Sequence, residues 1–150
     1  MSRQIKNIFA ITAFLICIGL INIAGQNIDI EIRGMNAFTF ILIVAVLLQI
    51  IFFIPSFLLK TEKYYDLVGS LTYVTTVSLA YFAVENKTMI DSIIYFYVMV
   101  WALRLGIYLF RRVRNDGKDV RFEKAKRHFF WFLQYWMGQA LWVSLTACAA

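Results

Sequence analysis

Residues 37–59 read AFTFILIVAVLLQIIFFIPSFLL, and this stretch decides the fold class. It holds no charged side chain, and it is longer than the about 20 mostly apolar residues that a helix needs to cross a hydrocarbon core of about 30 Å. Lipid offers no hydrogen-bond partner to backbone N–H and C=O groups, so a crossing segment of this kind forms a helix. The stretch therefore predicts a membrane-spanning helix.

Four more stretches share this character, apart from Arg104 inside one of them and an aspartate at the start of two. None alternates in polarity as the strands of a membrane barrel do. We predict an all-α fold, with one transmembrane domain built as an integral membrane bundle of about five helices and a cytoplasmic basic loop over residues 111–128. The helices are expected at about residues 7–25, 37–59, 66–84, 91–110 and 129–150.

The composition excludes other classes of protein. Hydrophobic residues make up 61% of the 150 residues and charged residues 16%, whereas a soluble domain has about half apolar and about a quarter charged residues. Disorder is excluded for the same reason, and two cysteines are too few for a secreted disulfide scaffold. We expect a multi-pass protein of a bacterial inner membrane or of the endoplasmic reticulum, with membrane lipids as partners.

The first apolar stretch has a second interpretation, because Arg3 and Lys6 resemble the basic start of a signal peptide. Its far end, around Asn22, Ala24 and Gly25, is a poor cleavage site, and four more spans follow it. We therefore expect a retained helix.

The 15 basic residues predict the orientation. With a cytoplasmic N-terminus, twelve of them fall in cytoplasmic segments, including eight in the 111–128 loop, and two fall in the outer loops. Only Arg104 lies within a span. This asymmetry is the positive-inside pattern, and it explains most of the net charge of +6 without a nucleic-acid partner.

Several common site chemistries have no matching residues. His128 is the only histidine, and Cys17 and Cys148 are the only cysteines. No metal ligands occur at the required spacing, so no metal site is predicted. The seven glycines form neither a GxGxxG nor a Walker motif.

The segment TEKYYDLVGSLT, residues 61–72, carries the first candidate site. Glu62 and Asp66 are four apart, so they share a helix face if the third helix begins early. Alternatively, Asp66 caps that helix and meets its dipole. The following serines and threonines favour contacts between helices.

Arg104 and the segment GKDVRF, residues 117–122, form the second candidate. Arg104 either extends to the headgroups or faces the bundle, where Asp66 is a partner on the same side. Asp116-Gly117 indicates a turn. Beyond it, Arg121 either meets a cofactor phosphate while Asp119 orients it, or both residues tie the loop to neighbouring helices.

These two segments, together with WALRLG and the later QALWV, resemble the DUF1295 family in order and spacing over about residues 40–150. The resemblance to these steroid 5-alpha reductase-like membrane proteins implies a helical membrane protein. It also implies NADPH-dependent reduction of a carbon–carbon double bond in a lipid or sterol-like substrate. On this basis we predict cofactor-binding roles for Arg104, Lys118, Asp119 and Arg121, and catalytic roles for Glu62, Asp66 and Tyr73.

The chain also departs from that family. Gln49 is followed by Ile50 instead of glutamate, and no motif chooses between Tyr73 and Tyr81 as proton donor. Family members are nearly twice as long, and the fifth apolar stretch runs to Ala150 without a polar end. We therefore expect an N-terminal fragment that lacks its C-terminal half and is inactive alone. The alternatives are a non-catalytic lipid binder or assembly factor, or half of a membrane lipid methyltransferase.

Overall fold

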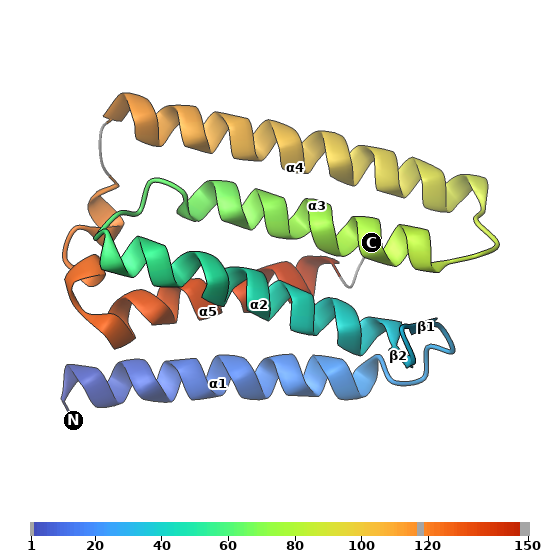
Figure 1. The fold of residues 1–150 in the computed structure, drawn as a ribbon, viewed down its shortest axis with the longest axis horizontal. Coiled ribbons are helices and arrows are strands. Elements are labelled where there is room, and N and C mark those ends of the chain that lie inside the picture. Colours follow the sequence, from blue (N-terminus) through green and yellow to red (C-terminus); the bar gives the residue numbers. More distant parts are fainter. Residues whose placement is uncertain (1, 117–118, 148–150) are drawn as a thin grey trace.

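The computed structural model describes residues 2–116 and 119–147 as a bundle of helices (Figure 1). This confirms the predicted all-α fold, and the helices lie close to the expected positions. The largest difference is at the end of the fourth helix, which continues into the basic segment. The helices are α1 (Arg3–Ala24), α2 (Ala37–Leu58), α3 (Tyr65–Ala83), α4 (Met89–Asp116) and α5 (Phe129–Ala147), with short 3-10 helices η1 (Val120–Phe122) and η2 (Ala125–Arg127) before α5.

The long helices run side by side, with α4 and α1 at opposite edges (Figure 1). α3 packs against α2, α4 and α5, whereas α1 packs mainly against α5. One end of the bundle holds the start of α1, the α2–α3 connection and residues 119–128. The predicted cytoplasmic segments therefore share one end, which we call the loop end. That this end faces the cytoplasm remains a prediction.

Three of the described helices, α1, α2 and α4, are long and apolar enough to cross a membrane. α3 and α5 are not among them, and membrane crossing by these two remains a prediction. Serines and threonines lower the hydropathy of α3. Three of them, Ser70, Thr72 and Thr76, are buried between helices and do not face lipid. Thr72 and Thr76 donate hydrogen bonds to backbone carbonyls one turn earlier, at 2.7 and 2.8 Å, so both buried hydroxyls have a partner.

A small hairpin joins α1 to α2, and the sequence analysis did not predict it. Strands β1 (Glu31–Ile32) and β2 (Met35–Asn36) pair antiparallel. Arg33 and Gly34 between them have positive φ angles of 54° and 76°, as both central residues of a type I′ turn require. Asn36 then caps α2, since its Oδ1 accepts from two backbone N–H groups at 3.0 and 3.2 Å.

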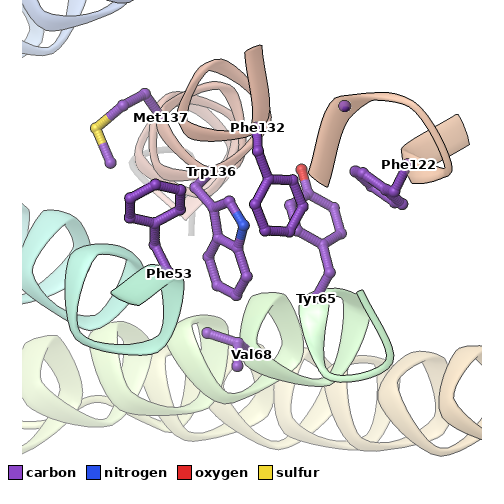
Figure 2. Packing of buried hydrophobic residues seen from close by; sticks show 8 residues of the cluster. Phe53, Tyr65, Val68, Phe122, Phe132, Trp136 and Met137 are labelled. Atoms are coloured by element: carbon purple, nitrogen blue, oxygen red, sulfur yellow. The ribbon is translucent and has the colours of Figure 1, made fainter. Parts of the chain in front are cut away.

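The main buried core lies toward the loop end and is largely aromatic (Figure 2). Side chains from α2, α3 and α5 meet there, and residues of η1 and η2 join them. The segment before α5 is therefore part of the fold and not only a basic surface. The core consists of Phe53, Tyr65, Val68, Phe122, Ala125, Phe132, Trp136 and Met137.

Candidate functional site

Glu62 lies just before α3 and is the most buried carboxylate at the loop end. Its residue is 4% exposed. Its Oε2 lies 2.7 Å from Lys126 Nζ, and its Oε1 accepts from the backbone N–H of Asp119 at 3.2 Å. Glu62 thus joins the start of α3 to the segment before α5. Because both carboxylate oxygens have partners, these contacts favour a structural role for Glu62 over a catalytic one.

A second group, the aspartate–arginine cluster, consists of Asp66, Arg112, Asp119 and Arg121. Arg121 donates from Nε to both carboxylate oxygens of Asp119 at 3.0 Å and also pairs through Nη2. Its Nη2 lies 3.5 Å from Asp66, and Arg112 lies 3.6 Å from Asp66 and 3.7 Å from Asp119. The two aspartate side chains are 11% and 10% exposed, whereas the arginines lie over them in contact with solvent.

Aromatic side chains pack on the buried side of the aspartate–arginine cluster and hold it in place. Phe122, next to Arg121, is 1% exposed, and its ring lies 4.7 Å from that of Tyr65 (Figure 2). The Tyr65 hydroxyl donates to the carbonyl of Tyr135 on α5 at 2.9 Å. The loop is therefore anchored both by apolar burial and by charge.

The structure corrects two expectations for the TEKYYDLVGSLT segment. α3 begins at Tyr65, so Glu62 precedes the helix and does not share a helix face with Asp66. Asp66 is not the cap either, because Tyr64 holds that position without a side-chain cap. Asp66 lies in the first turn and uses its carboxylate for the two arginines.

The predicted site residues fall into separate places. Glu62, Asp66, Asp119 and Arg121 meet at the loop end, whereas Lys118 lies outside the described residues. Tyr73 is buried further along α3, its ring 5.1 Å from Trp101 and its hydroxyl bonded to Thr146.

Arg104 lies apart from this cluster. It is exposed on the outer side of α4 and pairs with no acid in the described part of the chain. Asp66 instead pairs with Arg112 and Arg121, two residues that the sequence analysis did not assign to it.

NADPH phosphates require cations that are free to bind them. In the aspartate–arginine cluster each arginine already meets two carboxylates, and Lys126 meets Glu62. This donor set does not fit the phosphates of the cofactor. The structural tie, one of the two alternatives for Asp119 and Arg121, agrees better with these contacts.

At the opposite end, a cavity of about 170 Å³ lies between α2, α3, α4 and α5. Its walls are mostly apolar, and the rings of Tyr81 and Tyr95 stack at 4.3 Å along it. Their hydroxyls bond to Ser92 at 3.0 Å and to Ser78 at 3.2 Å. Tyr81, but not Tyr73, lines this cavity. Tyr95 was not among the predicted site residues, because it lies at no recognisable motif.

Hydrogen bonds from Arg121 lower the pKa of the Asp119 carboxyl below its ordinary value of 3.8. A lowered folded-state pKa contributes stability that is present above the ordinary value and is lost as the pH falls below it. We expect Arg121→Ala to lower the free energy of unfolding by about 1 kcal/mol at neutral pH, because the pair is partly exposed. The change should leave NADPH affinity unaltered.

Denaturant unfolding followed by circular dichroism and NADPH titration of the same preparation measure both quantities. Arg114→Ala is the matched control, since Arg114 is exposed on α4 and has no ion pair in the described residues. A weaker NADPH affinity at unchanged stability would contradict the structural role.

Comparison with known protein families places most of the chain in one family. A family model described as "Protein of unknown function (DUF1295)" matches residues 51–150, two thirds of the chain. The segments TEKYYDLVGSLT, WALRLG, GKDVRF and QALWV all lie inside this range. No curated protein and no solved structure matches the chain.

Proposed function

Because the chain belongs to the DUF1295 family, we propose that its helices form the substrate-binding bundle of a membrane reductase. The proposed reaction is NADPH-dependent reduction of a carbon–carbon double bond in a lipid or sterol-like substrate. The observation that carries the proposal is the cavity between α2, α3, α4 and α5, which pairs apolar walls with a few hydroxyl groups. Sites for small apolar ligands have this composition.

In this proposal the chain binds and orients the substrate. The apolar walls hold the hydrocarbon part and exclude water. The Tyr81 hydroxyl is a hydrogen-bond donor to a substrate carbonyl, and it becomes the preferred proton donor in place of Tyr73. The cations of the aspartate–arginine cluster take no part, so other residues would have to bind the cofactor.

Photo-cross-linking with a diazirine-bearing sterol enone tests the binding step in the purified chain. Ala80 lines the cavity and retains exposed surface, so Ala80→Phe should fill the cavity and reduce labelling about tenfold at a tolerable folding cost. Ala24→Phe, at the exposed end of α1 and outside the cavity, is the control and should label normally. Equal cross-linking of the sterol enone to both variants would show that the cavity is not the binding site.

Tyr81→Phe separates enone recognition from general lipid binding. Loss of one hydrogen bond to the carbonyl should weaken enone binding about three- to tenfold, while a carbonyl-free analogue should bind as before. Enone-dependent oxidation of NADPH is the measurement of activity. If the enone and the carbonyl-free analogue bind equally well and NADPH is not oxidised, the result would favour a lipid binder.

That second function, a non-catalytic lipid binder, has an observation of its own in support. Arg112, Arg121 and Lys126, the cations next to the buried carboxylates at the loop end, are all paired with those carboxylates in the described structure and are not free to bind a cofactor phosphate. Reductase and binder share the same cavity, so a preference for the enone over its carbonyl-free analogue that is lost in Tyr81→Phe would favour the reductase, whereas equal binding of the two ligands would favour the binder.

A further inference from the structure

The outer face of α4 carries a row of polar residues that neither the loop-end cluster nor the cavity uses. Arg104, Tyr108, Arg111 and Asn115 follow one another at intervals of four, three and four residues, so they lie on one helix face. Together with Ile107 and Arg112 they line a single hollow on the surface.

Two of these arginines have no counter-charge. Arg112 reaches the carboxylates of Asp66 and Asp119. Arg104 and Arg111 are exposed and make no ion pair within the part of the chain that the structure describes. The row therefore presents two unpaired guanidinium groups next to a paired one.

The helix that carries this row is one of those able to cross a membrane. α4 packs mainly against α3, so its outer face is left for lipid. An unpaired arginine on such a face is costly unless its side chain extends to the headgroups or meets an anion. A rise of about 1.5 Å per residue puts Arg104 about 10 Å below Arg111 along the axis, so Arg104 must point toward the loop end to reach headgroup level.

We propose that this row binds the phosphate of an anionic phospholipid in the leaflet at the loop end. Arginine guanidinium groups bind phosphate oxygens in a bidentate manner. Tyr108 and Asn115 supply further hydrogen-bond donors on the same face, and the second arginine favours a headgroup with net negative charge. A choline headgroup would bring its own ammonium group against that arginine.

The surroundings of the row favour a lipid over free phosphate. Leu103 and Ile107, beside Arg104, are 52% and 50% exposed. Leu103 precedes Arg104 and Ile107 lies between Arg104 and Arg111 along α4, so these apolar side chains give an acyl chain a surface beside the row of guanidinium groups. A small soluble phosphate would use the arginines but not this apolar surface.

Energy transfer from tryptophan to dansyl-phosphatidylglycerol in mixed micelles measures the binding with the full chain. Arg104→Gln and Arg111→Gln should each weaken binding about five- to tenfold, because each removes one charged contact near the membrane surface. Arg114→Gln removes the same charge from α4 outside the hollow, and it should change binding by less than about twofold. Circular dichroism verifies that the variants fold, which their exposed positions favour.

Competition identifies the ligand. Unlabelled phosphatidylglycerol should displace the probe, whereas phosphatidylcholine and glycerol 3-phosphate should require far higher concentrations. If Arg114→Gln weakens binding as much as the other two changes, only general charge attraction is present and the proposal is overturned. Displacement by glycerol 3-phosphate at the same concentration as the lipid would overturn the assignment to a lipid.

Discussion

Lys126→Met is expected to lower the free energy of unfolding by about 3–5 kcal/mol, the usual cost of removing one partner from a buried ion pair. The side chain of Glu62 is 3% exposed and that of Lys126 is 21% exposed. Methionine keeps most of the apolar stem of lysine but removes its charge. Among the described residues, the Glu62 carboxylate would then retain only the backbone N–H of Asp119 as a hydrogen-bond partner, with no ion pair there to offset its loss of water.

Equilibrium unfolding in mixed micelles, followed by circular dichroism, measures this loss. Lys124→Met is the matched control, because Lys124 is exposed two residues earlier and pairs with no acid in the described part of the chain. The double variant Glu62→Gln/Lys126→Met should recover a large part of the loss, since no charge then remains buried. Equal effects of the two lysine changes would mean that the Glu62–Lys126 pair does not hold the loop.

The helices were predictable because lipid imposes a strong rule on sequence. A crossing segment must be long, apolar and hydrogen-bonded within itself, and residues 37–59 satisfy that rule without any knowledge of the neighbours. The same rule says nothing about which helices touch. The tie between Glu62 and Lys126 joins residues 64 positions apart, and only the packed bundle shows it.

The side of α4 that Arg104 faces could be predicted in part from the sequence. Ala102 and Gly106 form a small-xxx-small pattern, which marks the side of a membrane helix that approaches a neighbour. Arg104 lies two residues from each and therefore points to the other side of α4. Of the two orientations predicted for Arg104, the structure has the outward one, as this pattern indicates.

The anchoring of the basic loop was harder to foresee. Phe122 and Ala125 are separated by charged residues, as in any solvent-exposed loop. Their burial at 1% and 0% exposure depends on Tyr65 and on the aromatic start of α5. The acids of the loop did indicate order beyond a lipid-binding patch. Asp119 pairs with Arg121 two residues later, and it also pairs with Arg112 on α4, a contact that local spacing could not identify.

Gly106→Ala is expected to destabilise the chain by about 1–3 kcal/mol, the usual cost of overpacking, although alanine normally stabilises a helix relative to glycine. A Cβ at position 106 would lie 2.6 Å from the Cβ of Ser70 on α3. Ser70 cannot easily move away, because its hydroxyl donates to the carbonyl of Ala102 at 2.6 Å and the residue is 7% exposed. α4 must therefore shift away from the helix on which it mainly packs.

The same substitution at Gly19 provides a control of opposite sign. No atom lies within 4 Å of a Cβ built there, so Gly19→Ala should stabilise the chain by up to about 1 kcal/mol through helix propensity alone. Ser70→Gly added to Gly106→Ala removes the opposing Cβ and should restore much of the lost stability, even though it also removes the hydroxyl. Unfolding in mixed micelles gives all three values. If Gly106→Ala matches Gly19→Ala, the close approach of α3 and α4 does not exist in the membrane protein. If Ser70→Gly fails to restore stability, the damage comes from somewhere other than this contact.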